Sequence, residues 1–250
     1  MSVALNRAVR YGIRNYLRAA GVLLLVMLLI PLALWAVLAS LGDSGRYNGF
    51  SLSVGLFGLV LGMVGIRENL RMLNQNGVSR RTAFLAEIIS QAATAVLVSL
   101  GAAALLAAYR TLPGLVARVE VSDVCRMIYA DEAAGPAGYL RLAVFSSAMT
   151  FSLAGVGQFW SVLYWRLSKF WTVAVSIAIP LAAIVGPAVL LTAADGPTAT
   201  GEAAIRALAA LGRFFAGSVW NAALVFLALA GVSFGLSWLL VRRAVIREGK

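Results

Sequence analysis

Six long stretches of apolar residues dominate this chain of 250 residues and limit what it can fold into. A helix needs roughly 20 apolar residues to cross about 30 Å of hydrocarbon. None of the six stretches has a charged residue near its middle; Glu87, close to the start of the third, comes nearest. The pattern predicts an all-α, multi-pass membrane protein that forms a single domain over residues 1–250. Its six transmembrane helices are expected at residues 19–41, 50–66, 83–108, 140–164, 170–194 and 218–241.

The composition agrees with a membrane protein and narrows the chemistry. Hydrophobic residues make up 61% of the chain and charged residues 12%, which excludes a disordered chain and is too apolar for a water-soluble domain. The chain has no histidine and one cysteine, Cys125, so Ser/His and Cys/His catalytic pairs and His-ligated metal sites cannot be assembled. We therefore predict a non-enzymatic chain without catalytic, cofactor-binding or metal-binding residues.

The basic residues are distributed unevenly between alternate loops. Counted along the six expected helices, 14 of the 21 Lys and Arg residues fall on the side that holds both termini, and 7 fall on the other side. Because cytoplasmic loops retain Lys and Arg, this predicts a cell-membrane protein with both termini in the cytoplasm. The net charge of +11 then faces anionic headgroups from short loops, so the lipid bilayer, not nucleic acid, is the expected partner.

The residues before the first apolar stretch have the period of an amphipathic helix. Arginines recur every three or four residues on one face, and apolar residues occupy the opposite face. We predict an interfacial helix over residues 1–18, with its basic face toward anionic lipid and its apolar face in the membrane surface. The alternative is a positively charged anchor without helical order. The two faces comprise Arg7, Arg10, Arg14 and Arg18, and Leu5, Val9, Ile13 and Tyr16.

A polar segment at residues 67–87 links the second and third expected helices and faces the cytoplasm. Asn76-Gly77 can adopt the left-handed conformation that ends a helix, and Ser79 can cap the helix that follows. The segment is therefore expected to form a helical hairpin with a tight turn. It carries more donors and acceptors than a turn needs, which predicts a docking surface for a cytoplasmic partner; the alternative is a solvated turn that only fixes the topology. These polar residues are Glu68, Asn69, Arg71, Asn74, Gln75, Arg80 and Arg81.

This layout resembles that of the type-2 ABC exporter permeases. The features that carry the resemblance are the amphipathic N-terminus, six membrane helices, cytoplasmic termini and the polar hairpin NQNGVSRRTAFLAE after the second helix. In the family pattern Glu68 matches the acidic residue that heads the coupling segment, residues 76–80 match its turn, and residues 84–86 match the start of the third helix. Many members have lysine where this chain has Glu87.

The resemblance implies that the chain forms half of a translocation pathway that a separate ATPase drives. The partners would be cytoplasmic ABC ATPase subunits and a second permease subunit, in a homodimer or a heterodimer. ATP and Mg would bind to the ATPase, in keeping with the lack of a G-x-x-x-x-G-K-[ST] loop in this chain. The residues that would couple to the ATPase are Glu68, Arg71, Asn74, Gln75, Asn76, Gly77, Val78, Ser79, Arg80 and Arg81. The candidate pathway residues, on the second and fifth helices, are Ser51, Ser53, Phe57, Thr172 and Ser176.

Two further segments are expected on the external side. Residues 109–139 form a loop whose acidic residues lack the signs of a buried pocket for acid–base chemistry. Residues 195–217 are too short and too charged to span the membrane, and they resemble the interfacial or re-entrant helices that the family places before its last span.

Small residues recur at intervals of four in the second and sixth expected helices and predict close helix contacts. Such contacts are compatible with packing inside one chain and with a seam between subunits. The pairs are Ser51 with Gly55, Gly58 with Gly62, Gly231 with Gly235, and Ser233 with Ser237.

The lack of charge near the centres of the expected helices bears on the substrate. It favours export of an apolar or amphipathic molecule such as a peptide, a lipid or a drug-like compound. It counts against an ATP-independent transporter or channel, because ion-coupled carriers usually have ionisable groups at that depth. That alternative stays open, as does a non-transporting membrane immunity or binding module, and a membrane enzyme is the weakest alternative.

Overall fold

The computed structural model describes residues 3–112, 119–132, 135–168, 170–178, 181 and 199–242. Five of its helices are long and apolar enough to cross a membrane, by length and composition. They confirm the predicted helices over 19–41, 50–66, 83–108, 140–164 and 218–241. Of the sixth predicted helix, residues 170–194, the structure shows helix over 170–178, and nearly all of the remainder lies outside the described residues. The elements are α1 (Val3–Leu41), β1 (Gly45–Asn48), α2 (Phe50–Gln75), α3 (Arg80–Arg110), β2 (Val119–Ser122), α5 (Val124–Ile128), α6 (Gly135–Tyr164), α8 (Ala199–Gly217) and α9 (Val219–Val241).

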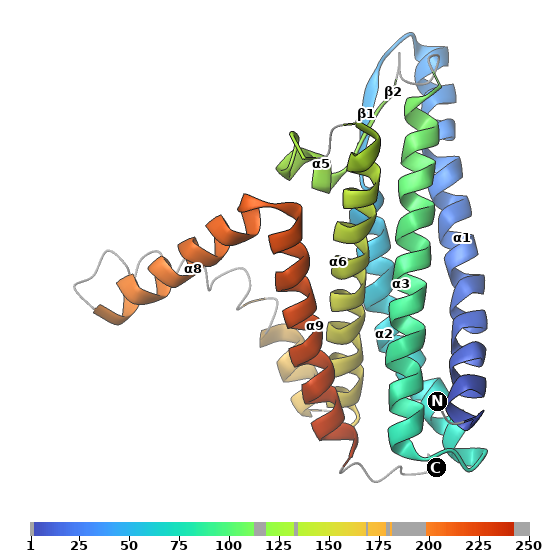
Figure 1. Ribbon diagram of the computed structural model, residues 1–250, viewed down its shortest axis with the longest axis vertical. Coiled ribbons are helices and arrows are strands. Elements are labelled where there is room, and N and C mark those ends of the chain that lie inside the picture. The colour runs from blue at the N-terminus through green and yellow to red at the C-terminus, as the bar shows by residue number, and fades with distance from the viewer. Residues whose placement is uncertain are drawn as a thin grey trace.

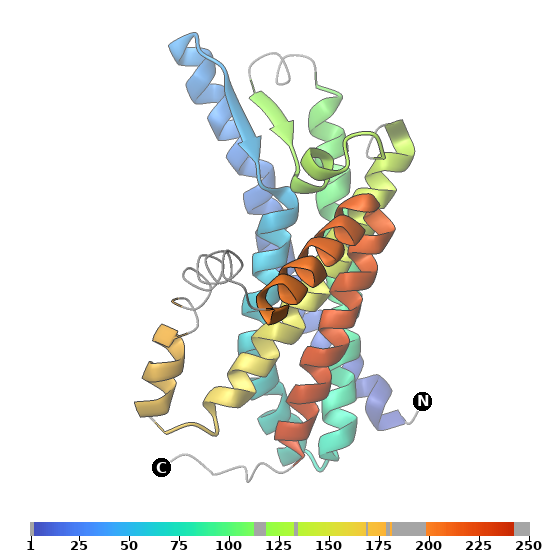
Figure 2. The ribbon, with the colours of Figure 1, turned by 90° about the vertical axis from the view of Figure 1, so that its left-hand side faces the viewer.

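The long helices form a bundle with two distinct ends (Figure 1). The turn between α2 and α3 lies at one end, here called the hairpin end, and the two strands lie at the other, here called the strand end. α2 packs most extensively on α6, α6 also packs on α9 and α3, and α3 packs on α1. α8 contacts α9 and projects away from the bundle (Figure 1); in the view turned by 90° it lies toward the viewer, in front of the bundle (Figure 2). The helix predicted within residues 195–217 is therefore present over 199–217, and its placement in the membrane surface stays a prediction.

α1 is one continuous helix from Val3 to Leu41 and includes the predicted amphipathic segment. The arginines of this segment, Arg7, Arg10, Arg14 and Arg18, are exposed. On the opposite face Ala8 and Val9 are buried in a cluster with apolar residues of α2 and α3. The apolar face of this segment thus packs against other helices of the same chain. The prediction that residues 1–18 lie in the membrane interface stays a prediction.

A seam of glycines brings α2 and α6 into close contact. A Cβ atom added at Gly58 or Gly62 would overlap backbone atoms of α6, and one added at Gly157 would overlap the backbone of α2. The predicted small-residue pairs of α2 therefore serve packing within this chain. In α9, by contrast, Gly231 and Gly235 face open space, with nothing within 4 Å of an added Cβ.

The strand end contains elements that the sequence did not predict. β1 and β2 pair in parallel, with Gly45 opposite Val119 and Asn48 opposite Ser122. β2 and the short helix α5 lie in the segment expected to be a loop, residues 109–139. At four residues each, these strands are at the lower limit of length for an alternating pattern to indicate a strand from sequence. Alternate residues of both strands point inward, and Val119 and Val121 join the buried core.

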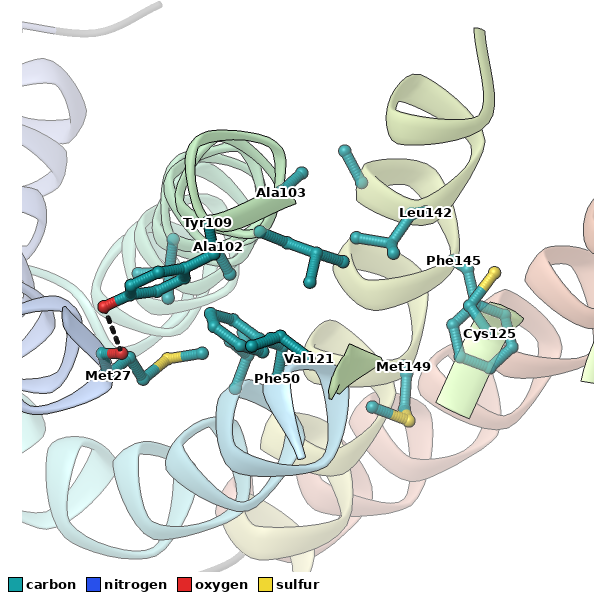
Figure 3. Packing of buried hydrophobic residues seen from close by; sticks show 14 of the residues in the cluster. Met27, Phe50, Ala102, Ala103, Tyr109, Val121, Cys125, Leu142, Phe145 and Met149 are labelled. Carbon is teal, nitrogen blue, oxygen red and sulfur yellow. Dashed lines mark hydrogen bonds between the residues drawn. The ribbon is translucent and has the colours of Figure 1, made fainter. Parts of the chain in front are cut away.

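That core joins the strand end to the membrane helices (Figure 3). Phe50 packs edge-on against the ring of Tyr109, and the Tyr109 hydroxyl donates a hydrogen bond to the carbonyl of Leu28. Val121 lies beside Phe50, while Cys125 lies beside Phe145 on α6 (Figure 3). The result is a closely packed unit in which α1, α2, α3 and α6 all contribute.

Candidate functional site

The turn between α2 and α3 has the capped geometry that its residues predict. Gly77 has φ of 75°, and the amides of Gly77 and Val78 donate to the carbonyls of Asn74 and Leu73, as in a Schellman motif. The Ser79 side chain then caps α3 by accepting a hydrogen bond from the Thr82 amide at 3.2 Å. Hydrogen bonds within residues 73–82 thus satisfy both helix ends and hold the turn on both sides.

The residues predicted to couple to an ATPase lie together on this turn and on the helix ends beside it. Eight of them are exposed: Glu68, Arg71, Gln75, Asn76, Gly77, Ser79, Arg80 and Arg81. Asn74 and Val78 are half-buried, and Val78 packs against the apolar cluster that contains Leu73. The structure therefore presents a polar surface that no described helix covers. Its docking to an ATPase stays a prediction.

The turn offers a direct test of its backbone geometry. Gly77 has nothing within 4 Å of an added Cβ, so substitution tests conformation without a clash. We expect Gly77→Ala to lower stability by about 1 kcal/mol, because L-residues are disfavoured in the left-handed region. Gly77→Asn should cost less, since asparagine tolerates this conformation. Thermal unfolding in detergent measures the stability of both variants. Equal unfolding midpoints would contradict the left-handed conformation of residue 77.

A buried polar cluster lies below the hairpin surface and was not predicted. Glu87, at the edge of the third apolar stretch, is 3% exposed. Its carboxylate accepts hydrogen bonds from Tyr16 on α1, Asn69 on α2 and Gln91 on α3. Gln91 also donates to Gln158 on α6 at 3.1 Å. The sequence signal was present, since Glu87 is an acidic residue inside an apolar stretch, but its partners are far away along the chain.

A second buried carboxylate, that of Asp123, lies at the strand end and binds Ser51, one of the predicted pathway residues. Asp123 is fully buried and accepts from the backbone amide and hydroxyl of Ser51, each at 2.6 Å. The Ser51 hydroxyl also lies 2.5 Å from that of Ser146 on α6. Because α2 has no side-chain cap of its own, Asp123 satisfies its first turn from another part of the chain. Ser51 is thus engaged inside the chain.

The other pathway candidates do not gather around Ser51 in the described residues. Ser53 and Phe57 are half-buried on α2, and Phe57 packs against the strand-end core. Thr172 and Ser176 lie after α6, and their hydroxyls donate to the carbonyls of Ser168 and Thr172. Since α6 runs from the strand end to the hairpin end, these two residues follow its far end (Figure 1). A shared pathway stays a prediction.

Glu132, like Asp123, has a structural role at the strand end. Glu132 accepts from the backbone amide of Val219 at 3.2 Å and from the Ser218 hydroxyl at 3.3 Å, and so caps α9. Tyr129 donates to the carbonyl of Phe215 in the last turn of α8. Carboxylates at helix N-termini satisfy free amides and complement the helix dipole. The segment 119–132 thereby ties the starts of α2 and α9 together.

Cys125 is expected to be an unreactive thiol. Burial, and then the negative charge of Asp123, raise the pKa of Cys125 to about 12. Because the thiolate is the nucleophile, its alkylation at pH 8 should be slower by roughly three orders of magnitude than that of an ordinary thiol. The raised pKa also means that the folded state binds this proton more tightly, so this stabilisation is lost as pH rises from 9 toward 12. Iodoacetamide labelling followed by mass spectrometry compares the alkylation rate of Cys125 in the folded and the denatured chain. Rapid labelling of the folded chain would contradict the prediction.

The five apolar helices make the chain compatible with a multi-pass membrane protein. In comparisons with known proteins, no family model, no curated protein and no solved structure matches the chain.

Proposed function

We propose that this chain is the permease subunit of an ATP-driven exporter of the type-2 ABC kind. It pairs with a second permease subunit in the cell membrane, with both termini in the cytoplasm. A separate cytoplasmic ATPase, which binds ATP and Mg, supplies the energy. The transported substrate is apolar or amphipathic, such as a peptide, a lipid or a drug-like molecule.

The observation that carries this proposal is the hairpin between α2 and α3. A solvated turn that only fixes topology needs few residues, whereas this turn is capped on both sides and, with the helix ends beside it, presents eight exposed residues of the predicted set. A rigid helix pair moves as a unit when a partner displaces its tip. The hairpin also carries the sequence pattern that resembles the family's coupling segment. Together these features support a docking site for an ATPase.

Partner retention tests the proposal most directly. We expect the tagged chain, expressed together with its neighbouring genes, to co-purify with a protein that contains a Walker A motif. Such a complex should show ATPase activity that the isolated chain lacks, because the chain has no phosphate-binding loop of this kind. Failure to retain any Walker-motif protein would remove the main support for the proposal.

Charge reversal at the hairpin tests coupling. Arg80→Glu with Arg81→Glu should leave ATP hydrolysis by the complex largely intact and lower transport of a dye-labelled phospholipid about tenfold, in the usual range of coupling between sites. Both side chains are exposed, so the variant should fold. Arg110→Glu, at the opposite end of α3, is the control and should transport normally. Normal transport by the double variant would assign the hairpin to topology alone.

One observation favours a second candidate, an ATP-independent ion-coupled transporter. Glu87 is an ionisable group buried in a membrane helix, and its hydrogen-bond donors are all uncharged. Proteoliposomes with an imposed proton gradient separate the two candidates. Gradient-driven flux without ATP that is lost in Glu87→Gln would favour the second candidate over the first.

A further inference from the structure

Glu87 joins three helices through a single carboxylate group. Asn69 donates to Oε2 at 2.7 Å, and Gln91 donates to Oε1 at 2.7 Å. The Tyr16 hydroxyl also donates to Oε1 and accepts from Asn69 at 2.8 Å. These residues come from α1, α2 and α3, and the bond from Gln91 to Gln158 adds α6. One small cluster therefore connects all four helices near the hairpin end.

Burial makes these bonds costly to break. Asn69, Gln91, Tyr16 and Gln158 are all at most 5% exposed, as is Glu87. A buried polar group that loses its hydrogen-bond partner bears the full cost of desolvation. The carboxylate has only uncharged donors, so each of them is needed to hold it in the bundle interior. Relative movement of the helices at this level would leave the carboxylate without partners.

The backbone around the cluster leaves little room for such movement. A Cβ atom at Gly65 on α2 would overlap the Tyr16 hydroxyl and approach Glu87 Oε1 to 3.0 Å. A Cβ at Gly12 on α1 would lie 2.5 Å from the Ser90 hydroxyl oxygen on α3. Ser90 in turn donates to the backbone carbonyl of Val9 at 3.2 Å. The three helices are therefore fitted closely to one another at the level of Glu87.

The cluster lies between the hairpin surface and the rest of the bundle. Glu87 follows the start of α3 by seven residues, a rise of roughly 10 Å. A displacement applied at the turn thus reaches this level before it reaches the middle of any helix. Packed, hydrogen-bonded elements transmit such a displacement as one body.

We propose that Glu87 is a positioning residue that locks the hairpin to α1 and α6, so that the hairpin ends of α1, α2, α3 and α6 move together. The locking is a property of this chain alone. Only the source of the movement, an ATPase docked on the hairpin, rests on the proposed function.

Distance measurements between spin labels test the lock without any partner. Labels are placed at Gln75 on α2 and Tyr11 on α1, which are both exposed, in the full chain in lipid nanodiscs. Glu87→Gln is nearly isosteric but has one acceptor oxygen in place of two, so Asn69 and Gln91, which donate to different oxygens, cannot both keep their bonds in place. We expect one narrow distance distribution in the unsubstituted chain and a clearly broader one in Glu87→Gln. Glu120→Gln makes the same substitution at an exposed position of the strand end and should leave the distribution unchanged.

Tyr16→Phe removes one donor to Glu87 and keeps the ring. If Glu87→Gln does not fold, the distance distribution of Tyr16→Phe tests the lock instead. Broadening in either folded variant supports the lock, and unchanged distributions in all folded variants overturn it. In a complex with an ATPase, Glu87→Gln should keep its rate of ATP hydrolysis and lose about tenfold in transport per ATP. A broadened distribution in a chain that retains no ATPase would leave the lock standing and count against the proposed function only.

Discussion

Gly62→Ala should abolish or severely reduce folding of the chain, although it adds a single methyl group. The added Cβ would overlap the carbonyl oxygen of Ala154 on α6 and crowd the amide of Gln158. These are backbone atoms, so no side-chain rotation relieves the overlap. Overpacking of a core typically costs about 1–3 kcal/mol, and we expect a value at or above the upper end because α2 and α6 form the most extensive helix contact. Thermal unfolding and the yield of monodisperse protein in detergent measure the effect.

Gly235→Ala provides the matched control for this prediction. It makes the same chemical change in a membrane helix, but nothing lies within 4 Å of the added Cβ. We expect unchanged or slightly raised stability, since alanine has the higher helix propensity by about 1 kcal/mol. Equal midpoints for the Gly62 and Gly235 variants would mean that α2 and α6 are not in the close contact described above.

Asp123→Ala should have the second large effect, through groups that lose their acceptor. The Ser51 amide, the Ser51 hydroxyl and the Cys125 amide all donate to this carboxylate inside the protein. Leaving buried donors without partners costs about 1–3 kcal/mol each, so the total should reach about 3 kcal/mol or more. Asp123→Asn keeps one acceptor oxygen and should lose about half as much stability.

The unfolding midpoint and the labelling rate of Cys125 both measure this change. Loss of the Asp123 contacts should loosen the strand end and expose the neighbouring thiol, so labelling becomes faster. Glu120→Gln, three residues away, is the control. Its carboxylate pairs with Arg46 at 2.6 Å on the surface, and such pairs contribute under about 1 kcal/mol. Slow labelling in Asp123→Ala would indicate that the strand end is held by its apolar core alone.

Much of the local structure was predictable because its causes are local. The apolar stretches predicted six membrane helices, of which the described residues confirm five, and the second extends as helix to Gln75, beyond its apolar part. Gly77 and Ser79 predicted the turn because a left-handed glycine and a serine cap act within a few residues of one another. The strands β1 and β2 were missed, since they are four residues long and stabilised by each other.

The sequence by itself determined which segments are apolar, which ends are capped and which residues of the hairpin are polar. Only the tertiary structure decided what the interior polar groups do. Glu87 meets Tyr16 across 71 residues, and Asp123 meets Ser51 across 72 residues. Periodicity along one helix does not specify which face of a distant helix lies opposite. Close glycine contacts set that pairing, and a buried carboxylate is stable only where the pairing supplies its donors.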